Sequence, residues 1–339
     1  MGIDYRDIPA LNQSSLKKIL THPQDYLSAV RRTGESKESH FVFGSMVDIM
    51  LTGTKEEFDS KFYVDKSNIN ISDAVKVITN DIIEELNNLG ADLKNWAQER
   101  DIILKHVVRN SYQGNWKDDT RIDAIIKAAD SYVNMLSEVN GRAIVDELDY
   151  SKAVNCVASL RSDQFTNPFS MLAKKAPKGI EVFDKFIVSY EHLGVNIKGE
   201  LDRVIIDHVT ETIKPIDFKT TSKPLMSFMG EFWKLRYDFQ AATYSIGLLN
   251  HPEIKELLDK GYTMDPFRFI VVHVDCITSP MVFTVPIKAI NIGFRGGETS
   301  VRYYEGLEQA IQRYKYATNN NAWEYPQEYY QKGSIDIEL

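Results

Sequence analysis

The chain has 339 residues, of which 43% are hydrophobic, and a formal net charge of -8. This length and composition allow a large buried core, so we expect one elaborated globular domain spanning residues 1–339. The acidic balance argues against a general nucleic-acid coat, although a local basic groove could still hold DNA. No apolar run is long enough for a membrane helix, and Cys156 and Cys276 are too few and too far apart for a disulfide framework, a zinc site or an iron–sulfur cluster.

The N-terminal segment MGIDYRDIPALNQ lacks the basic and apolar blocks of a signal peptide, which predicts a cytoplasmic protein. A helix is expected over residues 12–29, with a break at Pro23. A second, buried helix is expected over residues 41–51, where Gly44 would permit close approach to a neighbour and Asp48 interrupts an apolar surface.

Apolar residues then recur at intervals of three and four through residues 72–137, which predicts a helical insert. Polar, glycine-containing joins near residues 88–91 and 110–119 divide this insert into separate helices. Either a DNA channel or an oligomer contact would suit such an insert. A further helical pair is expected over residues 150–175.

Strand and helix patterns alternate through residues 180–319, which predicts an α/β core with a central mixed sheet of about five strands flanked by helices. The expected elements are, in chain order, strands 181–190, 195–207 and 213–220, a helix over 225–249, strands 267–274 and 280–286, and a helix over 297–319.

Three charged side chains are expected to converge in this core. Asp217 and Lys219 are two residues apart on one strand and therefore share a face. If strands 195–207 and 213–220 pair as a hairpin, Asp202 comes beside them. Two carboxylates and an ammonium at one place could hold Mg²⁺ and orient water or stabilise phosphate charge, as phosphodiester hydrolysis requires.

The acid-x-lysine triplet alone is a weak signal, because it recurs at positions such as Asp92-Lys94, and most such triplets are solvated surface charge. The apolar surroundings of Asp217 favour a site, since an unpaired carboxylate is costly to bury. Downstream, Gln240 and Tyr244 are four residues apart and so lie on one face of a helix. The whole set of residues is more specific than any part of it.

This set resembles the PD-(D/E)XK nuclease superfamily in its RecB-like branch, which adds a Gln-x-x-x-Tyr motif. Within that branch the chain is similar to the exonuclease VIII (RecE) nuclease domain and related phage exonucleases. The further segments that carry the likeness are YRDIPALNQSSLKKILTHPQDYLSA, FVFGSMVDIMLTG, FRFIVVHVDCITSPMVFTV and RYYEGLEQAIQRYKYATNNNAWEYP. Residues from about 65 to 150 are the least covered. The resemblance implies a restriction-endonuclease-like core.

The resemblance also implies a role for each matching residue. Asp202 and Asp217 would bind the metal, Lys219 would be the catalytic lysine, and the carbonyl of Phe218 would be a further ligand. The residues expected to support the site or to contact DNA are Gln240, Tyr244, Thr220, Thr221, Lys223 and Arg236. Glu181 is a candidate outer acid, with an exposed residue at a strand end as the alternative.

The sequence departs from this family at two positions. Family members usually carry a histidine four residues after the glycine of the first motif, whereas here Gly44 is followed by Asp48. Aspartate also binds Mg²⁺, so the resemblance makes Asp48 a further candidate ligand. From the residues alone, Asp48 would be a core polar residue with a hydrogen-bond partner. The second departure is Leu201, which stands where the family has proline before the aspartate.

The function that the resemblance implies is a Mg²⁺-dependent deoxyribonuclease, with Mn²⁺ as a substitute, that digests double-stranded DNA from an end in phage or bacterial recombination or replication. Such digestion would expose a single strand for an annealing or recombination protein, and a ring-like homo-oligomer would suit that role. Two alternatives stay open. One is a structure-specific or single-strand endonuclease on the same core, and the other is a catalytically silent nuclease-like fold that binds DNA or protein.

An acidic protein that binds DNA needs a local basic surface. The candidates for that surface are Lys214, Lys219, Lys223, Lys234 and Arg236 near the core, and Lys17, Lys18, Arg31 and Arg32 near the N-terminus. An ordinary solvated helix face is the alternative for each lysine outside the core.

Overall fold

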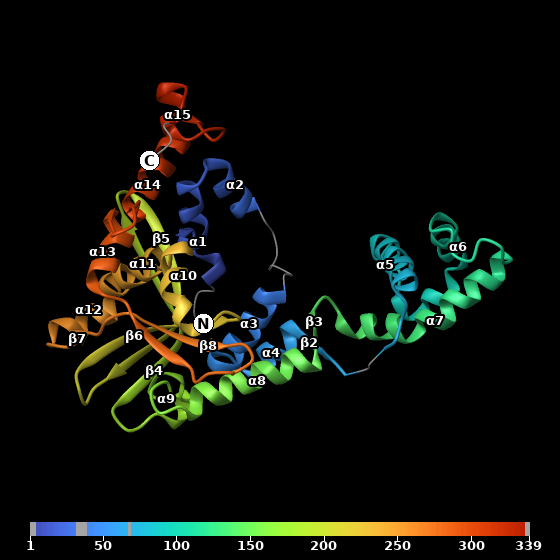
Figure 1. Cartoon of the computed structure of the whole chain (residues 1–339), viewed down its shortest axis with the longest axis horizontal. Coiled ribbons are helices and arrows are strands. Elements are labelled where there is room, and N and C mark those ends of the chain that lie inside the picture. Colours follow the sequence, from blue (N-terminus) through green and yellow to red (C-terminus); the bar gives the residue numbers. More distant parts are fainter. Residues whose placement is uncertain (1–4, 32–38, 67–68, 336–339) are drawn as a thin grey trace. The chain divides into compact units, whose positions relative to one another are not determined.

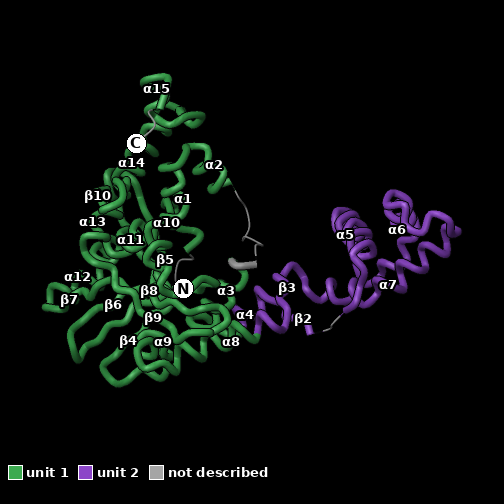
Figure 2. The backbone as a smooth tube through the Cα atoms, viewed as in Figure 1, with its two compact units in different colours: residues 1–55, 151–339 green, residues 56–150 purple. Residues whose placement is uncertain are grey.

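The computed structural model describes residues 5–31, 39–66 and 69–335, and these residues form two compact units (Figure 2). The first unit contains residues 1–55 and 151–339, and the second contains residues 56–150. The predicted insert, residues 72–137, falls within the second unit. No helix among the described residues combines the length and the apolar character needed to cross a membrane.

Seven strands form one sheet within the described part of the first unit (Figure 1). Its long strands are β4 (Ile180–His192), β5 (Val195–Asp207), β6 (Thr212–Thr221), β8 (Arg268–His273) and β9 (Met281–Thr284). The pairs β4–β5, β5–β6 and β8–β9 are antiparallel, and β6–β8 is parallel, so the sheet is mixed. The predicted α/β class is therefore confirmed. The strands that raise the number above the expected five are β1 (Leu11–Asn12) and β7 (Thr263–Met264).

Helices cover both faces of this sheet. The helices that pack against one face around the main apolar core are α10 (Phe228–Lys234), α11 (Tyr237–Asn250), α12 (Pro252–Asp259) and α13 (Ile287–Arg295). Helix α3 (Ser39–Thr52) packs against β5 and β6. On β6, Asp217 binds Gln240 of α11 and Thr220 lies beside Gly44 of α3, and because residues three apart on a strand point to opposite faces, these two helices lie on opposite sides of the sheet.

A second apolar cluster closes one end of the first unit. Its helical elements are α1 (Gln13–Leu16), η2 (Lys17–Leu20), α2 (Pro23–Arg31) and α14 (Leu307–Asn320). Tyr26 stacks on Trp323 in this cluster, with ring centroids 5.7 Å apart. The predicted break at Pro23 is present, because α2 begins at that residue.

The prediction of one continuous helix over residues 225–249 is wrong. The structure divides it into η5 (Leu225–Ser227), α10 and α11. The break falls at Arg236, whose φ of 59° is left-handed and cannot continue a helix. Its guanidinium then pairs with Asp238 in the first turn of α11, with Nε 3.0 Å from Oδ1.

The helix predicted over residues 297–319 begins later than expected. The strands β10 (Gly297–Glu298) and β11 (Tyr303–Tyr304) form a small hairpin first, and α14 starts only after Gly306. A Cβ on Gly306 would lie 2.4 Å from the amide nitrogen of Gly296, so the chain can turn here only with glycine. Helix α13, which precedes the hairpin, is an element that the sequence reading did not predict.

Helices α11 and α13 pack so closely that the backbone of one contacts the backbone of the other. A Cβ added to Gly293 of α13 would lie 2.1 Å from the carbonyl oxygen of Asp238 in α11. Real Cβ atoms do not approach backbone this closely, so the packing of the two helices depends on this glycine.

Helix α8 (Glu147–Ser162) brings the two cysteines together. Cys156 on this helix and Cys276, which follows β8, have Sγ atoms 3.7 Å apart and are both free thiols. The two cysteines are therefore far apart in the sequence but close together in the fold.

The second unit has its own apolar core. The helices that form this core are α5 (Asp73–Asn88), η3 (Leu93–Gln98), α6 (Arg100–Arg109) and α7 (Asp118–Val139), and α4 (Lys55–Lys61) also belongs mostly to this unit. Trp96, which is 1% exposed, is packed among apolar side chains of these helices. The strands β2 (Phe62–Asp65) and β3 (Ala143–Asp146) pair in parallel at the two ends of the segment. The joins between helices fall where the polar, glycine-containing segments predict them.

Candidate active site

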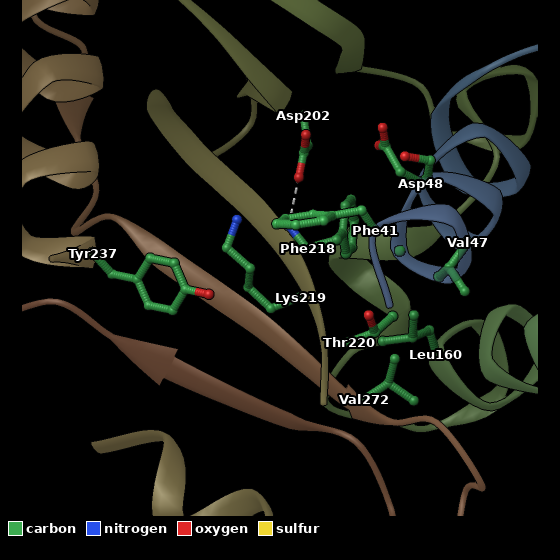
Figure 3. Close-up of a pocket in the computed structure, with 12 residues that line it drawn as sticks. Phe41, Val47, Asp48, Leu160, Asp202, Phe218, Lys219, Thr220, Tyr237 and Val272 are labelled. Carbon is green, nitrogen blue, oxygen red and sulfur yellow. Dashed lines mark hydrogen bonds between the residues drawn. The ribbon is translucent and has the colours of Figure 1, made fainter. Parts of the chain in front are cut away.

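The structure brings the three predicted core residues to one place (Figure 3). Strands β5 and β6 pair as the predicted hairpin, and their register runs from Asp207↔Thr212 to Arg203↔Ile216. Asp202 and Asp217 would be the next pair in this register, but the pairing of the two strands ends before them. Instead, a carboxylate oxygen of Asp202 accepts a hydrogen bond from the Phe218 amide at 2.8 Å.

Asp217 is held by two partners and is only 2% exposed. The side-chain amide of Gln240 donates to its Oδ1 at 2.7 Å, and the ammonium of Lys219 lies 2.5 Å from its Oδ2. Burial raises the pKa of Asp217 to about 7, and the carboxylate of Asp202 adds to this rise while Lys219 opposes it. Gln240 on α11 therefore fixes the orientation of Asp217.

Lys219 lies on the same strand face as Asp217 and points into the pocket with the Tyr237 ring nearby (Figure 3). Its Nζ lies 5.1 Å from the centroid of the Tyr237 ring and 5.8 Å from that of Phe269. Burial alone would lower the pKa of Lys219, but Asp217, Tyr237 and Asp202 together outweigh burial and hold that pKa above its ordinary value. The side chain is therefore a protonated ammonium at neutral pH.

Asp48 reaches the site from α3. Thr52, one turn further along this helix, donates its hydroxyl to Asp48 Oδ1 at 3.1 Å. Burial and the nearby carboxylate of Asp202 raise the pKa of Asp48. Gly44, on the same helix, lines the pocket, but a Cβ there would meet only Thr220 Oγ1 at an ordinary 3.6 Å. The fold therefore does not need glycine for helix packing at this position.

A buried arginine anchors α3 against the sheet. Arg203 is fully buried, and its Nη1 donates to the carbonyl oxygens of Phe169 and Met171, both at 2.8 Å. Its Nη2 donates to the carbonyl of Leu51 at 3.2 Å, and its Nε donates to Asp184 Oδ1 at 2.7 Å. One side chain thus fixes the end of α3 to β4, β5 and the C-terminal end of the short helix α9 (Asn167–Ser170).

Lys185 is a site residue that the sequence reading missed. Its ammonium forms an ion pair with Asp48 and lies 3.5 Å from Asp202 Oδ1, so it stands between two carboxylates. Burial would lower the pKa of Lys185, but Asp202 and Asp48 raise it above its ordinary value. The available signal was the charged pair Asp184-Lys185 in the middle of an apolar strand.

A pocket of about 340 Å³ lies at this site. Its polar lining includes Asp48, Asp202, Lys219 and Thr220, and Phe41 and Val272 are among its apolar walls (Figure 3). Carboxylates on one wall and an ammonium on another are suited to an anionic group held together with a cation.

The other predicted supporting residues have varied positions. Phe218 and Thr220 line the pocket, whereas Thr221, at the end of β6, accepts a hydrogen bond from the Lys223 amide at 3.0 Å. Tyr244 is 7% exposed, and its ring would lie 2.7 Å from a Cβ placed on Gly199 of β5. This tyrosine therefore packs α11 against the sheet.

Several of the predicted basic residues are paired within the protein. Arg236 binds Asp238 and the carbonyl of Glu305, and Lys223 lies 2.8 Å from a carboxylate oxygen of Glu231. Lys214 pairs with Asp207 at 2.8 Å, at the opposite end of β6 from the pocket.

The N-terminal basic residues also differ in environment. The ammonium of Lys17 donates to the carbonyl of Leu235 at 3.1 Å. Burial and the nearby cation of Lys219 lower the pKa of Lys17 to about 8. Lys17 is therefore the N-terminal lysine that lies within electrostatic reach of the site, while Arg32 lies outside the described residues.

Glu181 is not brought to the pocket. Its partner in the β4–β5 register is Ile206, four residues beyond Asp202, or ~13 Å along the strand. Its carboxylate lies 3.3 Å from His208 Nε2 and is largely exposed.

The site suits a hard divalent cation by its chemistry. Its donors are all oxygens, and the carboxylates of Asp48 and Asp202 already share one cation, the ammonium of Lys185. No three acidic, histidine or cysteine side chains of the described residues lie close enough together to form a metal cluster.

The structure thus has the mixed sheet, the Asp-x-Lys strand and the neighbouring aspartate that the sequence predicts for a nuclease core. Residues 103–322 match the family model of the PD-(D/E)XK nuclease superfamily. The chain belongs to this superfamily. A search of curated proteins finds no match.

One solved structure to which the chain is similar is that of a Eubacterium rectale protein described as a "Putative exonuclease". The two chains are 11% identical and superpose with a TM-score of 0.44. The match covers 100% of this chain and 96% of the other.

Proposed function

We propose that this chain is a metal-dependent deoxyribonuclease that digests double-stranded DNA from an end. The observation that carries the proposal is that Asp48, Asp202 and Lys219 line one pocket, with Asp217 paired to Lys219 beside it. Carboxylates and a protonated lysine at one pocket are suited to holding a divalent cation beside a phosphodiester. Membership of a nuclease superfamily supports the nuclease part of the proposal.

The carboxylates of Asp48, Asp202 and Asp217 and the carbonyl of Phe218 would hold Mg²⁺, for which Mn²⁺ could substitute. When bound, such an ion supplies charge stabilisation at the attacking and leaving oxygens of the phosphate. The raised pKa of Lys219 means that this side chain carries its proton, so it orients water or stabilises phosphate charge instead of removing a proton.

Other residues support this centre. Gln240 positions Asp217, and Tyr244 packs the helix that carries Gln240. Thr220 lines the pocket and can donate its hydroxyl to a phosphate oxygen. Thr221, Lys223 and Arg236 belong to the proposed DNA-contacting surface around the pocket.

The size of the pocket suits a short segment of DNA backbone as its occupant. A volume of about 340 Å³ lies near the lower end for small-molecule sites, so it has room for one phosphodiester group and a neighbouring sugar. The resemblance to exonuclease VIII extends the proposal to a role in phage or bacterial recombination or replication, with a strand-annealing partner and a ring-like homo-oligomer.

A cleavage assay tests the proposal against its alternatives. Linear and circular DNA, single- and double-stranded and labelled at either end, would be incubated with Mg²⁺ or with EDTA. We expect Mg²⁺-dependent release of short products from linear duplex only. Cleavage of circular DNA would identify an endonuclease, and no cleavage of any substrate would favour a silent nuclease-like binding module.

A further inference from the structure

Lys185 has a backbone conformation that is unusual for its place in a strand. Its φ is 55°, in the left-handed region, although it lies in the middle of β4. The β4–β5 register skips one position in this fully described stretch, between Asp184↔Arg203 and Phe186↔Leu201. A non-glycine residue adopts this conformation at a cost, so surrounding contacts must hold it there.

The skipped position places Lys185 opposite Asp202. The Lys185 ammonium lies 3.5 Å from Asp202 Oδ1 and forms an ion pair with Asp48. These two partners come from different elements, β5 and α3. The contacts of Lys185 with them therefore bring together the two carboxylates that we propose as metal ligands.

The charges of the site match this arrangement. Asp217 has its own cation in Lys219, at 2.5 Å, whereas Asp48 and Asp202 share Lys185. Two close carboxylates without a cation would repel each other, and an ammonium removes that repulsion as a metal ion would. The position that the ammonium occupies is the one that a divalent ion would need.

We propose that Lys185 is an internal competitor for the metal: its ammonium bridges Asp48 and Asp202 in the metal-free protein and leaves when a divalent ion binds. This inference rests on the proposed function, because it takes Asp48 and Asp202 as metal ligands. Lys185 is a positioning residue, since it acts through the two carboxylates. It holds them in place before the ion arrives and weakens the affinity for the ion.

The test is to measure Mn²⁺ binding by calorimetry, in the absence of DNA, for the wild type and for Lys185→Met. Removing the competing cation should lower the Kd for Mn²⁺ by about tenfold. In EDTA the variant should have a lower Tm than the wild type, and saturating Mn²⁺ should remove most of that difference. A lysine with a merely structural role would lower Tm equally with and without Mn²⁺ and leave the Kd unchanged.

Lys214→Met is the matched control. Lys214 is also half-buried and paired with one aspartate, Asp207, at 2.8 Å, but it lies away from the pocket. This variant should lower Tm without changing the Kd for Mn²⁺.

A second variant keeps the test decisive if Lys185→Met does not fold. Lys185→Arg retains the positive charge and can bind carboxylates through two N–H groups, so it should compete more strongly and raise the Kd for Mn²⁺. The inference would be overturned by an unchanged Kd in Lys185→Arg, or by an unchanged or higher Kd in Lys185→Met. Either result would leave the proposed function intact. A wild-type protein that binds no divalent ion would overturn the proposed function as well.

Discussion

At the scale of single residues, the proposed chemistry depends first on Lys219. Lys219→Ala should lower turnover by about 100-fold or more, because the ammonium acts on charge that develops in the transition state. The ion pair at 2.5 Å and the nearby Tyr237 ring place this charge at the pocket. Cleavage rates in Mg²⁺ and DNA affinity in Ca²⁺ would be measured in parallel, and affinity should change little.

Lys260→Ala is the control for this variant, because Lys260 forms an exposed ion pair with Glu256 on α12 and should not affect turnover. If Lys219→Ala retained activity within about tenfold of the wild type, the lysine would have no role in the chemical step.

The raised pKa of Asp217 predicts that the stability of the protein depends on pH. Its pKa rises from 3.8 to about 7 on folding, so between these values the folded, metal-free protein binds the proton more tightly than the unfolded chain. The stability that this group contributes is fully present at low pH and is lost as the pH rises through about 7. In EDTA, the Tm of the wild type should therefore fall more steeply across this range than that of Asp217→Asn.

Asp207 should give stability the opposite pH dependence, which serves as a comparison. Hydrogen bonds from Lys214 and Thr210 outweigh its burial and lower the pKa of Asp207 to about 2, so its contribution is lost only in acid, as the pH falls from 3.8 to about 2. Equal slopes for the wild type and Asp217→Asn would show that Asp217 is already ionised at neutral pH.

At the scale of the elements, Arg203 holds the framework around the site. Arg203→Met should lower the free energy of unfolding by ~3 kcal/mol or more, because the carbonyls of Phe169 and Met171 and the carboxylate of Asp184 would lose their partner. Urea unfolding would measure this loss. Arg100→Met, which breaks exposed ion pairs, is the control, and an equally small effect in both variants would contradict the anchoring role.

The sequence predicts the strands of the site well, because each is a long apolar run bounded by polar turns. The expected strand over residues 195–207 matches β5, and the strand over 213–220 differs from β6 by one residue at each end. The hairpin then places Asp202 beside Asp217 through register alone. The apolar pattern of each strand and the pairing of two consecutive strands are local properties, so both can be predicted from the sequence.

The elements that the sequence reading misplaced depend on contacts between distant residues. The left-handed φ of Arg236 is held by its contacts with Asp238 and Glu305, so periodicity alone predicts an unbroken helix there. Lys185 was missed for the same reason, because its conformation is tied to an aspartate on α3 that is far away in the chain. Neither left-handed conformation has a local sequence signature, and the charged pair Asp184-Lys185 in an apolar strand marks only the position of Lys185.

At the scale of the whole molecule, the second unit has the features of an independently folding segment. Its core includes Trp96, Ile82 and Ile103, all nearly or fully buried, and the parallel pairing of β2 and β3 brings the two ends of the segment together. A protein comprising residues 56–150 alone should therefore unfold cooperatively on heating, as followed by circular dichroism.

Ile103→Ala in that fragment should lower its Tm substantially, because Ile103 is fully buried in the core. A fragment without a cooperative transition would show that the second unit needs the first unit to fold.

The contact at Gly293 connects a remote glycine to the candidate catalytic centre. A methyl group at this position would be forced against the carbonyl of Asp238, at the start of the helix that carries Gln240. Gly293→Ala should therefore loosen the support of Asp217 and yield a heat-sensitive allele, whose product cleaves DNA in the cold and fails when warmed. Gly230→Ala, where no atom lies within 4 Å of the added carbon, should behave as the wild type at both temperatures. A genetic screen for conditional loss of this nuclease should thus recover changes in α13, a helix that contributes no side chain to the pocket.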